Sequence, residues 1–81
     1  MKVMTSNEFN NLMYHEKMEA VLKATFLIDR LSDHYYIKLY NLDNFYVEVF
    51  YDDHSHLIAR FRAFEHTLFL VPYLENLKIA V

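Results

Sequence analysis

The chain has 81 residues, 54% of them hydrophobic and 17% aromatic, which is enough for a single domain, 1–81, around one core. Its formal net charge of −3 provides no basic surface for a phosphate backbone, which argues against nucleic-acid binding. The absence of cysteine and glycine excludes disulfides, thiolate metal sites and glycine-rich phosphate loops.

The chain also lacks signals for membranes or secretion. No apolar run approaches the roughly 18 residues that a transmembrane helix needs. The N-terminal segment MKVMTSNEF has no apolar region of the secretory type. Together with the lack of cysteine, this favours a cytoplasmic protein that does not contact a membrane.

The first predicted element is a helix over roughly residues 6–23. Thr5 and Glu8 have the spacing of a capping box at its start. An apolar stripe of helical spacing runs along one face through Phe9, Leu12, Met13, Met18, Val21 and Leu22. This stripe is interrupted near Tyr14, which indicates a kink there or a division into two short helices.

Strand-like segments follow at 24–31, on both sides of a loop within 35–52, and at 57–64. In the last strand Phe61 and Ala63 belong to the side that is the better core candidate, which leaves Arg60 and Arg62 pointing outward.

The C-terminal segment contains the only proline, Pro72, which is comfortable only in the first turn of a helix. Leucines and a tyrosine at helical spacing predict a short helix over about residues 70–77. The predicted fold is therefore α+β: a four-stranded antiparallel meander with an N-terminal helix, possibly kinked, and a short C-terminal helix, both on one face.

The central hairpin allows two registers. A two-residue loop would place Leu39 opposite Glu48, so that a charge lies among apolar side chains. A loop of three residues shifts the pairing by one, so that Lys38 faces Glu48 and Ile37 faces Val49.

We predict the three-residue loop, Leu42–Asn44, because it pairs aliphatic side chains and opposite charges. It needs a left-handed residue at its last position, and Asn44 tolerates that conformation better than most residues other than glycine.

In this register one hairpin face is a plain core face and the other is unusually aromatic. The second face carries Tyr36, Tyr40, Tyr46 and Phe50 around the pair Lys38 and Glu48. Such tyrosines are either ordinary residues of an exposed sheet or the contact surface for a partner, most simply a second copy that forms a homodimer.

The Asp52–His56 turn is the best candidate for ligand chemistry. Asp52, His54 and His56 are residue types that bind divalent metals, and two histidines at alternate strand positions point the same way. The same residue types are what a turn without glycine must use, so the metal signal is weak and we expect no cofactor.

Arg60 and Arg62 have two interpretations. They bind a carboxylate or phosphate ligand, or they pair with Glu48 or Glu65 and cover tyrosines with their side-chain stems.

Several stretches give the chain a resemblance to small uncharacterised single-domain proteins of Bacteroidetes-type bacteria. They are TFLIDR at 25–30, LYNLDNFYVEVFYD at 39–52, RFRAF at 60–64 and PYL at 72–74. The resemblance implies a shared fold and a bacterial cytoplasmic protein, without an activity or site residues. That group would suit glycine at the hairpin loop, where this chain has Asn44.

No motif names a reaction. The sequence therefore predicts a non-enzymatic protein-interaction domain that self-associates through the aromatic sheet face. The alternative is a protein that binds a small ligand or a divalent metal with the Asp52–His56 turn.

Overall fold

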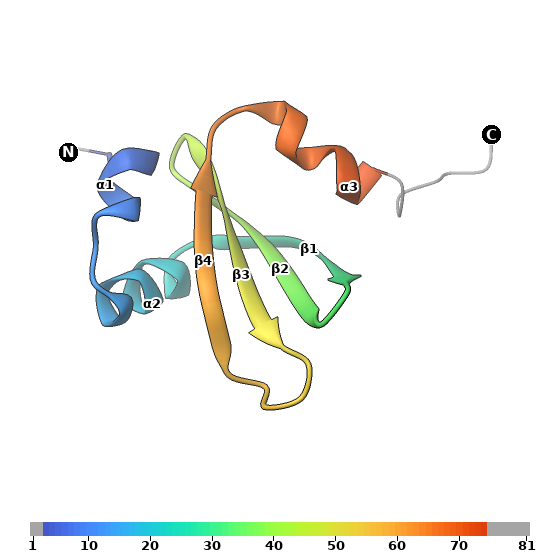
Figure 1. Cartoon of the computed structure of the whole chain (residues 1–81). Helices are drawn as coiled ribbons and strands as arrows, with labels where there is room; N and C mark the ends of the chain where they lie inside the picture. Colours follow the sequence, from blue (N-terminus) through green and yellow to red (C-terminus); the bar gives the residue numbers. More distant parts are fainter. Residues whose placement is uncertain (1–2, 75–81) are drawn as a thin grey trace.

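The computed structural model describes residues 3–74 and shows an α+β fold (Figure 1). Four antiparallel strands form one sheet in the order β1-β2-β3-β4, so each strand pairs with its neighbour in sequence. This confirms the predicted meander. The elements in chain order are α1 (Ser6–Asn10), α2 (Tyr14–Leu22), β1 (Thr25–Ser32), β2 (Tyr35–Leu42), β3 (Phe45–Asp52), β4 (Ile58–Phe64), the 3₁₀ helix η1 (Thr67–Leu70) and α3 (Val71–Leu74).

The N-terminal helix divides into two, one of the two outcomes that the lapse in the apolar stripe predicts. The capping box at its start is confirmed: Thr5 Oγ1 accepts from the Glu8 N–H at 3.1 Å, and Glu8 Oε1 accepts from the Thr5 N–H at 3.0 Å. The second helix begins in a similar way, because Glu16 Oε1 accepts from the Met13 N–H at 2.8 Å. Each helix thus satisfies a free N–H at its first turn.

The register predicted for the central hairpin is wrong. The loop has two residues, and Leu39 pairs with Glu48 while Lys38 pairs with Val49. The charge of Glu48 is balanced by residues of β1 and β4, as shown below, so the hairpin does not need the Lys38–Glu48 pair.

The left-handed loop residue is Asp43, with φ of 53°, where Asn44 was expected. Asp33 and His56 take the left-handed conformation in the other two hairpin connections, with φ of 51° and 63°. Aspartate tolerates this region better than most side chains, and a chain without glycine must use such residues in its tight turns.

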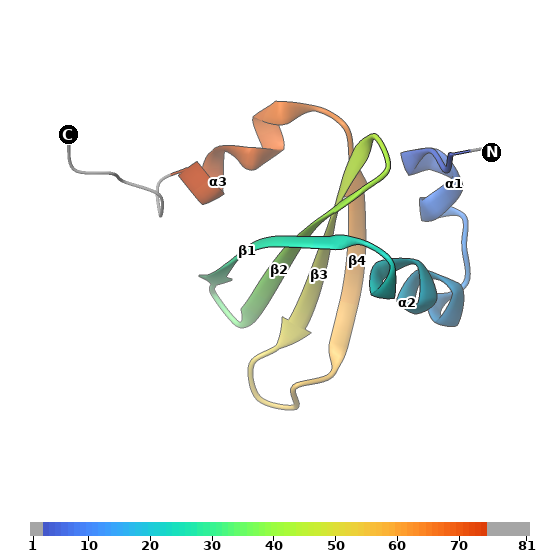
Figure 2. The same cartoon turned by 180° about the vertical axis from the view of Figure 1, so that it is seen from behind.

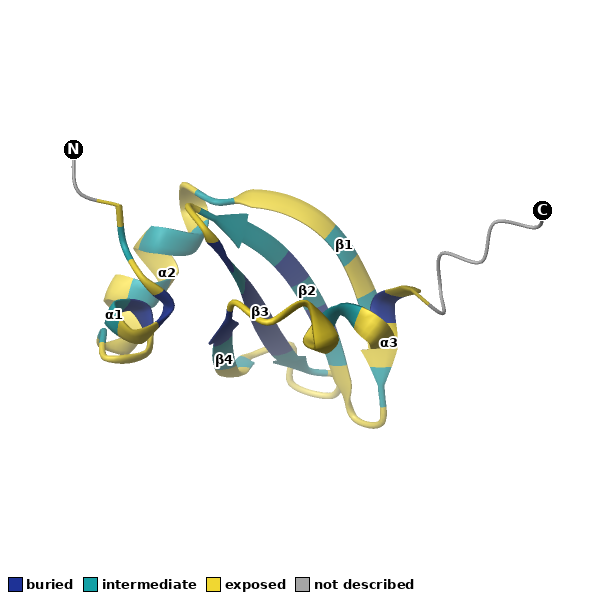
Figure 3. Ribbon diagram, turned by 90° about the horizontal axis from the view of Figure 1, so that it is seen from above, coloured by how far each residue is buried: buried dark blue, intermediate teal, exposed yellow. Residues whose placement is uncertain are grey.

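The sheet has a core on each face, whereas the sequence predicts both helices over one face. On the helix-side face α1 contributes Phe9, which packs with Phe45, Val47, Val49 and Ala63. On the opposite face, α3 contributes Tyr73, which packs with Ile37, Leu39, Phe50 and Phe64. Views from behind and from above show the helix pair and α3 on different sides of the sheet (Figures 2 and 3).

The C-terminal helix is short, as predicted, and Pro72 lies in its first turn. It is preceded by the 3₁₀ helix, in which His66 Nδ1 accepts from the Leu68 N–H at 3.1 Å. Residues 75–77 of the predicted helix lie outside the described residues. Within residues 3–74, no helix combines the length and the apolar character that a membrane span requires.

Candidate functional site

The six predicted interface residues do not share a face. Residues that lie opposite each other in an antiparallel pair point to the same face of the sheet. The observed register differs from the predicted one by one residue, so the predicted interface residues of β2 lie on one face and those of β3 on the other. Three of the six lie on the helix-side face: Tyr36, Lys38 and Tyr40. The other three lie on the face that α3 covers: Tyr46, Glu48 and Phe50.

Glu48 is the centre of a buried ion cluster, with none of its surface exposed. Its Oε2 accepts from the Tyr73 hydroxyl at 2.6 Å and from Arg30 Nη2 at 3.4 Å. Its Oε1 lies 2.8 Å from Arg62 Nε, close enough for an ion pair but without the alignment of a hydrogen bond. Two guanidinium groups, from β1 and β4, therefore compensate one buried carboxylate.

This cluster anchors α3 to the sheet. Tyr73 is only 2% exposed, and the Arg30 guanidinium lies 4.9 Å from the centre of its ring. Burial, followed by the hydrogen bond to Glu48, raises the pKa of Tyr73 above its ordinary value of 10, so the phenol stays protonated and donates. Because the carboxylate is closed to solvent and paired with two guanidinium groups, we interpret the cluster as structural.

The two arginines of β4 differ in role. Arg62 pairs with Glu48, which is one of the interpretations given above. Arg60 lies 4.2 Å from the centre of the Phe50 ring and covers that ring with its guanidinium. Glu65 accepts from Ser6 Oγ at 2.6 Å and so ties α1 to the end of β4.

Strand β1 is an edge of the sheet, and no other strand within residues 3–74 pairs with its outer side. All eight of its residues are exposed or half-buried, in contrast to the buried centres of β2 and β3 (Figure 3). Leu31 is 78% exposed, and Phe26 and Leu27 are about half exposed. The register shifts between Phe26 and Ile28, so Leu27 forms a bulge in this edge.

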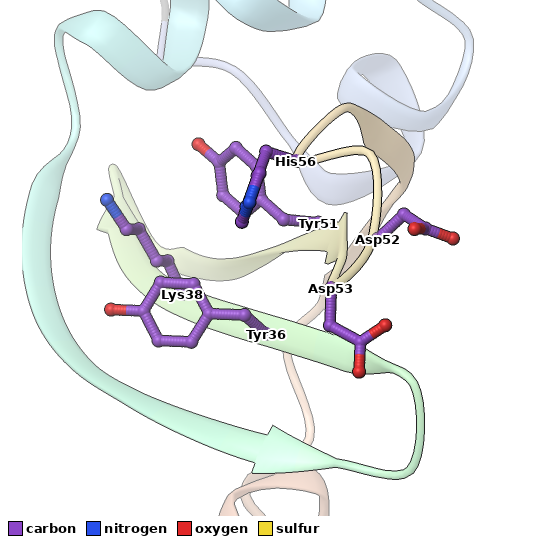
Figure 4. A pocket seen from close by; sticks show the side chains of 6 residues that line it. All are labelled: Tyr36, Lys38, Tyr51, Asp52, Asp53 and His56. Carbon is purple, nitrogen blue, oxygen red and sulfur yellow. The ribbon is translucent and has the colours of Figure 1, made fainter.

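A cavity of about 270 Å³ opens on the helix-side face, between the central hairpin and the turn that follows β3. Its lining includes Tyr36, Lys38, Tyr51 and His56, and the two tyrosine rings lie 6.3 Å apart between centres. Asp52 and Asp53 complete the lining, but their carboxylates point away from the space between the rings (Figure 4).

Some of the polar side chains around the cavity have hydrogen-bond partners and others do not. The Tyr36 hydroxyl donates to Asp29 Oδ2, and this hydrogen bond raises the pKa of Tyr36 above 10. Burial raises the pKa of Tyr51 in the same direction. Lys38 Nζ lies 5.8 Å from the centre of the Tyr36 ring and 5.5 Å from that of Tyr51, and no carboxylate of residues 3–74 is within ion-pair distance of it. Both phenols therefore stay neutral, and the lysine is the cation of the site.

The metal candidates of the following turn are only partly brought together. Asp52, Asp53 and His54 lie close together, and one potential ligand atom of each residue is within 4.8 Å of those of the other two. His56 belongs to the cavity instead. Asp52 Oδ1 accepts from the N–H groups of His54 and Ser55, both at 2.9 Å.

Asp53 Oδ1 lies 2.7 Å from His54 Nδ1, and this contact raises the pKa of His54 above 6.5. These contacts are the internal bonding of a turn, so they do not point to a bound metal.

The Asp52 turn predicts a dependence of stability on acid. The backbone hydrogen bonds from Ser55 and His54 lower the pKa of Asp52 below its ordinary value of 3.8. The Asp52 carboxylate therefore stabilises the fold fully at pH values above the pKa that this carboxyl has in the unfolded chain. The stabilisation is lost as the pH falls through the pKa that it has in the folded protein. We expect Asp52→Asn to lose less stability than the parent between pH 6 and pH 3, measured by urea unfolding. Equal losses in the two proteins would contradict this assignment.

Comparison with protein-family models, with curated proteins and with solved structures gives no match for this chain. The resemblance to small bacterial proteins therefore stays a prediction.

Proposed function

We propose that the domain is a protein-interaction module that self-associates through the outer edge of β1. The observation that carries the proposal is the hydrophobic character of this edge strand, whose outer side pairs with no other strand of residues 3–74 and whose most exposed apolar residue is Leu31. An edge strand presents a row of unpaired N–H and C=O groups, and natural proteins commonly protect it with lysine, proline, a bulge or a covering element. This edge carries neither lysine nor proline, and its bulge at Leu27 leaves residues 28–32 regular. The proposal includes no catalytic activity.

A second copy is the partner that this edge suits best. The two charged residues of the strand are engaged within the monomer: Asp29 accepts from Tyr36, and Arg30 binds Glu48. Neither charge is left to repel an identical strand. A strand can pair with an antiparallel copy of itself about a two-fold axis, which is the commonest symmetry of homodimers. The bulge at Leu27 restricts regular pairing to residues 28–32.

Part of the aromatic surface predicted from the sequence would border this contact. Tyr36 and Tyr40 lie on β2 directly beside β1, opposite Leu31 and Phe26. The rings of Phe26 and Tyr40 lie 5.7 Å apart between centres, so an aromatic strip follows the edge on the helix-side face. Aromatic residues are typical of interface centres, which supports the same surface.

The test is the mass in solution of the parent and of two matched variants. Leu31→Lys places a charge on the edge, and Leu22→Lys places the same charge on α2, where the leucine is 83% exposed. We expect the parent and Leu22→Lys to be dimers, and Leu31→Lys to be a monomer, by sedimentation equilibrium over a range of concentrations. A parent that is monomeric at every concentration, or an edge variant that remains dimeric, would reject the proposal.

A further inference from the structure

We propose that the cavity beside the Asp52–His56 turn binds a compact aromatic carboxylate, with Lys38 as the anion-binding group. This site is separate from the β1 edge and does not depend on the proposed self-association. Its volume of about 270 Å³ falls just below the range of about 300–1,000 Å³ that is typical of pockets for drug-sized ligands. A ligand with a single ring therefore fits its size.

The charge of the ligand follows from which groups are already engaged. Of the nearest carboxylates, Asp29 accepts from Tyr36, Asp52 accepts from the turn backbone, and Asp53 contacts His54. By contrast, the Lys38 ammonium contacts only the faces of two rings within residues 3–74. Among the charged side chains that line the cavity, Lys38 is thus the one without a hydrogen-bond or ion-pair partner within residues 3–74, and an ammonium group favours an anion.

A second donor faces the same cavity. The ring of His56 lines it near the Tyr51 ring and has no hydrogen bond within the described part of the chain (Figure 4). An imidazole N–H is a second donor, besides the Lys38 ammonium, for a carboxylate in the cavity.

The aromatic part of the ligand follows from the walls. Tyr36 and Tyr51 carry no charge, and their rings can pack against the ring of a ligand whose carboxylate is turned toward Lys38. Their planes are tilted by 39° and their centres are 6.3 Å apart, which leaves edges and faces available to a third ring. The two aspartates at the rim limit affinity for an anion, but their carboxylates point away from the space that the ligand would fill (Figure 4).

Three ligands that share one ring separate the possibilities: benzoate, benzylamine and benzyl alcohol. Each is titrated into the full chain, labelled with ¹⁵N, and the amide signals are followed by NMR. We expect benzoate to shift the signals of Lys38, Tyr51 and His56 in a saturable manner, and the amine and the alcohol to bind at least about tenfold more weakly, as loss of one charge-assisted hydrogen bond implies.

Matched variants identify the groups responsible. Lys38→Met keeps the length of the side chain and is expected to weaken benzoate binding about tenfold, as is His56→Asn, whose side chain tolerates the left-handed conformation. Lys23→Met, at the C-cap of α2, removes a charge away from the cavity and should leave binding unchanged. Amide dispersion like that of the parent shows that each variant is folded. Saturable binding of benzylamine in preference to benzoate, unchanged binding by Lys38→Met, or no binding of benzoate would overturn the proposal.

Discussion

Replacing Glu48 by alanine is expected to lower the free energy of unfolding by about 3–5 kcal/mol, the usual cost of removing one partner from a buried ion pair. The variant leaves Arg30, whose side chain is only 15% exposed, without its counter-charge, and leaves the buried Tyr73 hydroxyl without an acceptor. A domain of this length has a total stability of about 4–12 kcal/mol, so the expected loss is a large part of the total. Urea unfolding followed by circular dichroism measures the difference.

Two further variants separate the loss of charge compensation from a general effect of truncation. Glu19→Ala on the exposed side of α2 should change stability by no more than about 0.5 kcal/mol. Changing Glu48, Arg30 and Arg62 to methionine together with Tyr73 to phenylalanine should recover most of the loss, because a whole buried cluster can be exchanged for apolar packing at little net cost. A single Glu48→Ala variant as stable as the parent would show that the cluster does not anchor the fold.

Local sequence patterns predicted the elements of this fold well. The capping box at Thr5 and Glu8, the break after α1, the four strands and the position of Pro72 all depend on residues close together in the chain. Their physical causes are local hydrogen bonds and backbone preferences, which a single sequence displays directly.

The hairpin register could not be predicted from the same local information. Pairs across the hairpin alone favour the three-residue loop, because in the true register Glu48 lies among apolar side chains of the hairpin. The partners that make this acceptable, Arg30, Arg62 and Tyr73, come from β1, β4 and α3. Interactions of Glu48 with segments distant in sequence therefore outweigh the favourable cross-strand pair of Lys38 and Glu48 that the three-residue loop would form.

One sequence signal did point toward the outcome. Both faces of β2 and β3 are largely apolar or aromatic, a pattern that is typical of strands covered on two sides. The predicted interface residues Phe50 and Tyr46 belong to the core under α3 rather than to an open surface. The cavity could not be predicted from the sequence either. It requires Tyr36 to lie beside Tyr51, and these two residues are paired only when the hairpin loop has two residues.

Phe9 provides the second large expected effect, because it is the side chain by which α1 enters the helix-side core. It is fully buried, and its ring centre lies 6.0 Å from that of Phe45 and 6.1 Å from that of Phe61. Phe9→Ala removes the ring and leaves a cavity between α1 and the sheet, for which we expect a loss of about 3–5 kcal/mol in the free energy of unfolding.

The matched control for this variant is Phe26→Ala, which removes the same ring from β1. Because Phe26 is 49% exposed, about half of its surface is already in water, and the expected loss is about 1 kcal/mol. Hydrogen exchange of Phe9→Ala, measured where the variant remains folded, should show faster exchange in α1 and β4, which contact each other, than in the β1–β2 pair. Equal losses in the two variants would mean that α1 does not contribute to the core in the way its packing on β3 and β4 implies.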